Sequence, residues 1–192
     1  MKKLINKFKM DPMLLATLVT STFYSTTFPY INKMIISNVS ESVIAIQNIV
    51  YCIAVIVFGS VWNKAPKMFK YYPMFCIAET VGNVLLCVIT LLTHNMTLYY
   101  VIDTVIICIV TRNLCCGGIR LRAMVYNDED SRNNYDNNNN TMNSIGVIVG
   151  SSLAIGLRLS FDVMLIIATI GNCFDNIMYI YIYYHYKNKK ST

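Results

Sequence analysis

Charged residues are scarce in this chain. Asp, Glu, Lys and Arg make up 14% of the 192 residues, whereas apolar side chains make up 55%. Soluble globular domains usually contain about 25% charged residues. The composition therefore excludes an ordinary soluble domain and predicts an integral membrane protein, with the lipid bilayer as its first partner.

Motifs of soluble enzymes and metal sites are also missing. The sequence contains no His-x-x-x-His pair, no phosphate-binding glycine loop and no Gly-x-Ser-x-Gly turn. Cys115 and Cys116 are adjacent, without the spacing of zinc-binding pairs, and all seven cysteines lie in or at the end of apolar segments. We therefore expect no enzymatic activity, no cofactor, no metal and no disulfide framework.

What the sequence does contain is six apolar segments, each long enough to cross a bilayer as a helix of about 20 residues. They lie near 13–32, 43–62, 72–93, 97–118, 141–158 and 162–184. We predict an all-α integral membrane bundle of six transmembrane helices, with one domain over 13–184. The remainder predicts a cytoplasmic N-terminal tail over 1–12, a polar loop over 119–140 and a basic cytoplasmic tail over 185–192.

The basic residues are distributed unequally between alternate loops. All of them except Lys33 and Arg158 fall in segments that share one side of the membrane if the N-terminus is cytoplasmic. Lys and Arg are enriched on the cytoplasmic side of membrane proteins. We therefore predict a multi-pass protein of the cell (plasma) membrane with both termini in the cytoplasm. The net charge of +6 then reflects orientation, and we expect no nucleic-acid partner.

Four ionisable residues fall inside the predicted membrane helices, where an unpaired charge costs roughly 3 kcal/mol or more. Glu79 and Arg112 are expected at similar depth, which suggests an ion pair; alternatively, Arg112 extends to the inner interface. Asp103 and Asp175 either hydrogen-bond to neighbouring side chains or bind and release a proton. With Asn83, one turn from Glu79, these residues are candidates for a substrate or ion pathway.

The first predicted helix carries a run of hydroxyl side chains between Thr20 and Thr27. Lipid does not stabilise such groups, so they face either neighbouring helices or a water-filled cavity. Tyr24 and Thr27 are our candidates for lining that cavity.

Two glycine patterns give further expectations. Gly146 and Gly150 form a small-residue stripe that allows another helix to approach closely. Gly59 closes the second predicted helix and is followed by Asn63, Lys64 and Lys67. This last pattern resembles the short basic loop between the second and third helices of major facilitator superfamily carriers. In that family the loop reads Gly-x-x-x-Asp-Arg/Lys-x-Gly-Arg/Lys, so Asn63 replaces the acidic residue and Pro66 the second glycine.

Two further features carry the same resemblance. Arg112 resembles the buried arginine in the fourth helix of these carriers. Arg132 and the polar segment that leads to Gly146 and Gly150 are similar to the approach to the fifth helix in drug-efflux members. The resemblance covers the N-terminal six-helix half of a carrier and implies that Gly59, Asn63, Lys64 and Lys67 form a packing surface or gating loop.

Full carriers of this kind hold the substrate between two six-helix halves. The resemblance therefore implies a half-size, proton-coupled carrier or efflux protein for an unknown small molecule, working as a homodimer or with a second six-helix half. Two alternatives remain: a non-transporting membrane accessory, immunity or regulatory protein of the same shape, and a truncated N-terminal half of a carrier.

Overall fold

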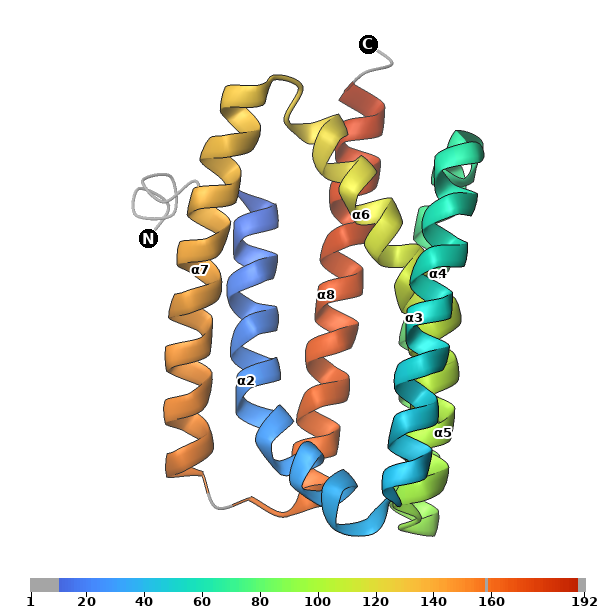
Figure 1. Cartoon of the computed structure of the whole chain (residues 1–192). Coiled ribbons are helices and arrows are strands. Elements are labelled where there is room, and N and C mark those ends of the chain that lie inside the picture. The colour runs from blue at the N-terminus through green and yellow to red at the C-terminus, as the bar shows by residue number, and fades with distance from the viewer. Residues whose placement is uncertain (1–10, 158, 190–192) are drawn as a thin grey trace.

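The described part of the chain is almost entirely helical. The computed structural model describes residues 11–157 and 159–189, and these contain no β-strand. The helices in Figure 1 are α2 (Pro12–Asn38), α3 (Glu41–Lys64), α4 (Tyr72–Thr93), α5 (Met96–Ile106), α6 (Arg112–Val125), α7 (Glu129–Gly156) and α8 (Phe161–Lys189). A 3₁₀ helix, η1 (Pro66–Tyr71), precedes α4, and a π turn, η2 (Ile107–Thr111), joins α5 to α6. The all-α prediction is confirmed.

Four segments of the described chain are long and apolar enough to cross a membrane. They are Glu41–Lys64, Lys67–Thr93, Met96–Val125 and Phe161–Asn188. Helices α2 and α7 have 27 and 28 residues but are less apolar, because α2 carries the hydroxyl run and α7 carries Asn137 to Asn140. The structure therefore supports a membrane protein with six long helices, of which four have the composition of membrane spans.

The predicted polar loop over 119–140 is wrong. Helix α6 continues to Val125, and α7 begins at Glu129. Asp128 starts α7 by accepting a hydrogen bond from the Ser131 N–H at 2.7 Å, which satisfies one of the free N–H groups at a helix start. Two other helices also run further than predicted, α2 to Asn38 and α8 to Lys189, whereas α4 has the predicted bounds. Most of the predicted N-terminal tail, Arg158 and the last three residues of the C-terminal tail lie outside the described residues.

Gly117 and Gly118 do not end a helix as their sequence suggested. Instead, Gly117 provides space: a Cβ atom there would lie 2.2 Å from Tyr72 Cδ2 and 3.1 Å from the Trp62 ring. The glycine therefore lets α6 pack directly on the aromatic side chains of α3 and α4. The helix continues through both glycines to Val125, and Gly117 lies at the contact with Tyr72 and Trp62.

The six long segments pack in a fixed order. Helix α7 lies on α2, α2 on α8, α8 on α4, and α4 on the continuous α5–η2–α6 rod, which in turn carries α3. This pattern has an internal symmetry. If α2 is exchanged with the rod, α3 with α7 and α4 with α8, the list of main helix contacts stays the same. For example, the contact of α2 with α7 corresponds to that of the rod with α3.

The close contact between α2 and α7 uses glycines and hydroxyls. A Cβ atom at Gly146 would lie 2.8 Å from the Leu18 carbonyl oxygen, and one at Gly150 would lie 2.4 Å from the Thr22 carbonyl oxygen. Hydrogen bonds from the hydroxyl run cross the same contact, from the Ser21 hydroxyl to Asn143 Oδ1 at 2.5 Å and from the Thr26 hydroxyl to the Gly150 carbonyl at 3.2 Å. Part of the hydroxyl-rich face of α2 is therefore satisfied by a neighbouring helix, which was one of the two alternatives from the sequence.

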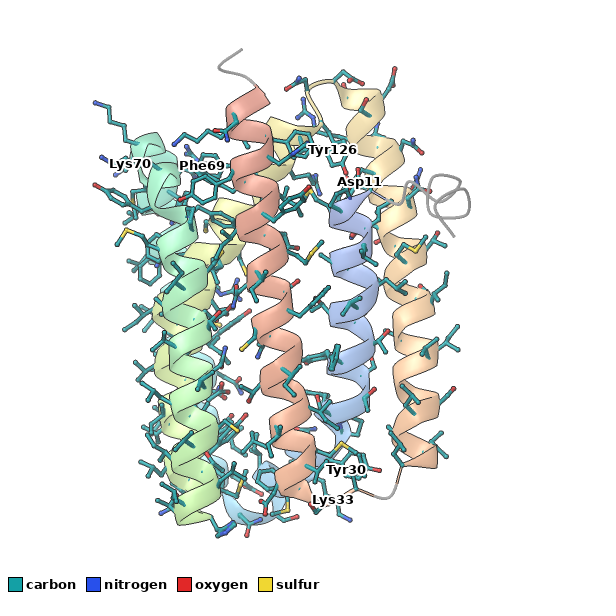
Figure 2. All side chains as sticks on the ribbon, turned by 180° about the vertical axis from the view of Figure 1, so that it is seen from behind. Asp11, Tyr30, Lys33, Phe69, Lys70 and Tyr126 are labelled. Carbon is teal, nitrogen blue, oxygen red and sulfur yellow. The ribbon has the colours of Figure 1, made fainter. Side chains whose placement is uncertain are left out.

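The two ends of the bundle differ in charge. At one end, α3 ends, α4 begins, α6 passes into α7, and α8 ends; we call this the basic end (Figure 1). Its described basic residues are Lys64, Lys67, Lys70, Arg120, Arg122, Arg132 and Lys187. Figure 2 labels Lys70 at this end and Lys33 at the opposite end. The opposite end also carries Glu41 and Asp162, and the basic end carries the acidic residues Asp11, Asp128, Glu129, Asp130 and Asp136.

Candidate functional site

Three acidic side chains lie on three neighbouring helices of the bundle. Glu79 lies on α4, Asp103 on α5 and Asp175 on α8. Within the described residues, no ion pair joins a basic side chain to any of the three. We call these residues the acidic cluster. They do not come close enough together, with any other described His, Cys, Asp or Glu, to form a group that could hold a metal ion.

Glu79 is held by two neutral hydrogen-bond donors. The Thr111 hydroxyl donates to Oε1 at 2.5 Å, and the Asn176 side-chain amide donates to Oε2 at 2.9 Å. Asn176 is buried on α8, at 2% exposure, whereas Glu79 is half-buried. Glu79 therefore links α4 to both α8 and the rod.

Asp175 has a similar but simpler environment. The Thr20 hydroxyl on α2 donates to Asp175 Oδ1 at 2.7 Å. This bond connects the hydroxyl run of the first helix to the acidic cluster. Each of the two carboxyls, Glu79 and Asp175, therefore has a threonine hydroxyl as a partner.

The π turn η2 ends at the residue that contacts Glu79. In this turn the Arg112 N–H donates to the Ile107 carbonyl, five residues earlier, instead of four as in an α-helix. Single π turns within α-helices occur frequently at functional sites. Here the extra residue sets the rotation of the helix, so that Thr111 meets Glu79 on α4.

The predicted ion pair between Glu79 and Arg112 is wrong. The Arg112 guanidinium lies 4.1 Å from the centroid of the Tyr51 ring on α3. Such cation–π contacts stabilise a cation over an aromatic face. Since Glu79 is already bonded to Thr111 and Asn176, the arginine and the carboxylate have separate partners.

A cavity of about 470 Å³ opens beside Glu79 and Asp175. It lies between α4, α6 and α8. Its lining residues are Tyr72, Glu79, Thr111, Leu114, Cys115, Gly118, Ile119, Asn172, Asp175, Asn176 and Tyr179. The lining thus combines two carboxyls with amide, hydroxyl and aromatic groups, and it can hold a small polar molecule or several waters.

The structure separates the sequence-predicted pathway residues into two groups. Glu79 and Asp175 line the cavity, whereas Asp103 does not. Arg112, Asn83, Tyr24 and Thr27 do not line it. Tyr24 is 59% exposed and stacks on Phe28, with ring centroids 4.7 Å apart. Thr27 is buried, and its hydroxyl donates to the Phe23 carbonyl of its own helix at 2.9 Å.

Sequence reasoning missed three of the polar partners: Thr20, Thr111 and Asn176. Asn172, Asp175 and Asn176 follow one another at helical spacing of three and four residues, which places them on one face of α8. That spacing was a usable signal. The contact of Thr111 was not readable, because it depends on the π turn.

The residues of the family-like loop lie at the basic end. Asn63 and Lys64 form the last turn of α3, and Lys67 is in η1; all three are exposed. A Cβ atom at Gly59 would meet no atom within 4 Å. Gly59 therefore does not serve close packing within this chain, and its face of α3 is open to lipid or to another subunit.

Hydrogen bonds tie the helices together at the basic end. The Tyr126 hydroxyl donates to Asp11 Oδ2 at 2.5 Å, and Arg122 pairs with Asp136 at 2.7 Å. Burial, followed by the bond to Asp11, raises the pKa of Tyr126 above its ordinary value. The first contact joins the start of α2 to the end of α6, and the second joins α6 to α7.

Comparisons of the chain with protein families, with curated proteins and with solved structures give no match. The functional conclusion therefore depends on the geometry of the acidic cluster and its cavity.

Proposed function

We propose that this protein is a half-size, proton-coupled membrane carrier for a small molecule, in which the acidic cluster binds and releases the coupling proton. It works as a homodimer or with a second six-helix half in the cell membrane, with both termini in the cytoplasm. The observation that carries the proposal is that two carboxyls of the acidic cluster, Glu79 and Asp175, line one cavity without a basic partner in the described chain.

The hydrogen bonds of the cluster support proton binding. A threonine hydroxyl can either donate or accept, whereas an amide N–H can only donate. If a proton binds at Glu79 Oε1, the Thr111 hydroxyl can turn to accept it, while Asn176 still donates to Oε2. Thr20 can serve Asp175 in the same way. Both carboxyls therefore keep satisfied partners in either protonation state, as a coupling residue requires.

The symmetry of the bundle supports a carrier-like architecture. Halves of major facilitator carriers contain two inverted three-helix repeats. The exchange of the first three segments for the last three reproduces the main helix contacts of this chain. In such carriers the substrate lies between two halves, so one copy of this chain provides one side of the substrate site. The open surface at Gly59 on α3 is compatible with a second half.

The charge of the two ends supports the proposed orientation. The basic end carries all the described basic residues except Lys33, at the opposite end, and Arg112, within the α5–η2–α6 segment. Positive residues near helix ends favour the cytoplasmic side. We therefore place the basic end in the cytoplasm.

The first experiment is to count subunits in native lipid by single-molecule photobleaching or native mass spectrometry. We expect two copies per particle, or one copy with another six-helix chain. A particle that contains one copy alone would overturn the two-half carrier, because alternating access requires two halves that move relative to each other. That result would favour the accessory or regulatory role.

The second experiment tests proton binding directly. Infrared difference spectra, recorded during an acid titration in lipid nanodiscs, detect the C=O stretch of protonated carboxyl groups. We expect Glu79→Gln or Asp175→Asn to remove a band from a site shielded from solvent. Glu41→Gln, at the exposed first turn of α3, is the matched control and should leave that band unchanged. If the spectra of all three variants equal that of the wild type, the acidic cluster does not exchange protons.

A further inference from the structure

A second pocket lies at the basic end, separate from the acidic cluster. Its volume is about 410 Å³, and it is lined by Lys67, Phe69, Lys70, Met124, Tyr183 and Lys187. These residues come from η1, α6 and α8, so three separate segments build one site. Figure 2 shows Phe69 and Lys70 together at this end, beside α8. We call it the lysine pocket.

The 3₁₀ geometry of η1 places two of the lysines together. A 3₁₀ helix has three residues per turn, so side chains three positions apart lie directly above one another. Lys67 and Lys70 have this spacing within Pro66–Tyr71. The third, Lys187, lies with its ammonium 5.6 Å from the centroid of the Tyr183 ring. The pocket therefore has three cationic residues in its lining and no acidic one.

The floor of the pocket is apolar. Phe69 meets Tyr183 edge-on, with ring centroids 5.2 Å apart, and Tyr183 is only 3% exposed. Met124 of α6 completes this surface. A site with cations on one side and aromatic and aliphatic groups on the other matches a ligand that joins a phosphate to hydrocarbon.

The depth of the pocket also matches such a ligand. Lys67 is the first residue of one candidate membrane span, and Lys187 lies one residue before the end of another, Phe161–Asn188. The lysine pocket is therefore at the boundary between hydrocarbon and headgroups. Basic pockets between membrane helices on the cytoplasmic side bind anionic lipid headgroups.

We infer that the lysine pocket binds the phosphate of an anionic phospholipid in the cytoplasmic leaflet, with Phe69, Met124 and Tyr183 contacting the glycerol and upper acyl chain. The inference requires that the bundle is embedded in a membrane, but it does not require transport or proton binding. Its test is therefore independent of the proposed carrier function.

The test uses native mass spectrometry of the full chain released from nanodiscs. One set of nanodiscs contains phosphatidylcholine only, and the other contains phosphatidylcholine with a minor fraction of phosphatidylglycerol. We expect the wild type to retain phosphatidylglycerol preferentially. Lys67→Gln/Lys70→Gln should weaken this retention roughly thirtyfold, given the usual contribution of each lysine near an anionic surface. Lys67→Arg/Lys70→Arg keeps both charges and should retain the lipid.

The matched control is Lys33→Gln/Lys64→Gln. It removes the same charge from exposed positions outside the pocket, and we expect it to retain the lipid. Equal losses in the pocket and control variants would overturn the inference, since binding would then depend on overall charge. Circular dichroism spectra should be identical for all variants.

A further arm distinguishes lipid from soluble phosphate. Inorganic phosphate at increasing concentration is added to the wild-type protein in phosphatidylglycerol nanodiscs. We expect the lipid to remain bound, because the apolar floor contributes to lipid binding only. Complete displacement by inorganic phosphate would identify a soluble anion site and contradict the lipid assignment.

Discussion

Thr111 donates its hydroxyl to Glu79 Oε1 at 2.5 Å, and this contact joins the α5–η2–α6 rod to α4. A threonine at the end of a π turn thus satisfies a carboxyl on another helix. The position of the Thr111 hydroxyl beside Glu79 therefore depends on the π turn η2.

Thr111→Val tests this contact, because valine keeps the shape of threonine but lacks the hydroxyl. We expect the free energy of unfolding to fall by about 1–3 kcal/mol, since half-buried Glu79 loses a donor. Thr111→Ser should retain most of the stability. Reversible unfolding in detergent, followed by circular dichroism, measures the difference. Thr104→Val is the control, because its hydroxyl bonds only to the Tyr100 carbonyl of its own helix; equal losses at positions 104 and 111 would contradict the assigned role of Thr111.

The α2–α7 contact depends on the absence of a side chain at Gly150. A Cβ atom there would lie 2.4 Å from the Thr22 carbonyl oxygen, so Gly150→Ala must push the two helices apart. We expect a loss of about 1–3 kcal/mol in the free energy of unfolding. Gly59→Ala is the control, because its Cβ has open space, and it should be neutral or stabilising by up to about 1 kcal/mol. Equal effects of the two substitutions would show that the missing side chain at Gly150 is not required for the α2–α7 contact.

Glu79 and Arg112 should behave independently, because their side chains have different partners. In a double-mutant cycle, we expect the effects of Glu79→Gln and Arg112→Gln on unfolding to add within about 0.5 kcal/mol. The same cycle with Glu79→Gln and Thr111→Val should show a larger coupling, since these residues share a hydrogen bond. A strong coupling between Glu79 and Arg112 would instead restore the ion pair that the sequence suggested.

The start of α7 should depend on pH. Hydrogen bonds from the Ser131 N–H and hydroxyl lower the pKa of Asp128 below its ordinary value. A carboxyl with a lowered folded-state pKa stabilises the helix start above its unfolded-state pKa, about 3.9, and this contribution is lost as pH falls through the folded value. We therefore expect amide hydrogen exchange at Ser131 to accelerate in acid after correction for the intrinsic rate. Asp128→Asn keeps the cap without the charge and should remove this acceleration.

The sequence was sufficient for the general architecture but not for the extent of each helix. Apolar length predicted the four segments that have the composition of membrane spans. The asparagine-rich stretch was misread as a loop, because its composition is polar throughout. The structure makes it helical through local contacts: Asp128 caps α7, and Tyr135 is buried against Tyr126, with ring centroids 4.6 Å apart.

The candidate site was predictable only in part. Ionisable residues within apolar segments stand out, so Glu79, Asp103 and Asp175 were identified from position alone. Their partners depend on the relative rotation of neighbouring helices, and a single π turn changes that rotation. The sequence of Ile107–Thr111 contains no local pattern that predicts a π turn. The contact of Arg112 with Tyr51 and that of Thr111 with Glu79 could therefore not be predicted from the sequence.

The chain has one tryptophan, Trp62, and it lies where α3 meets α6. Its indole N–H donates to Asn113 Oδ1 at 2.7 Å in a buried site, and its backbone carbonyl accepts from Arg120. Fluorescence excited at the long-wavelength edge of the indole band, where the tyrosines do not absorb, therefore comes from this single junction. The protein carries its own optical reporter of any movement between α3 and α6, and such movement can be followed without attaching a dye.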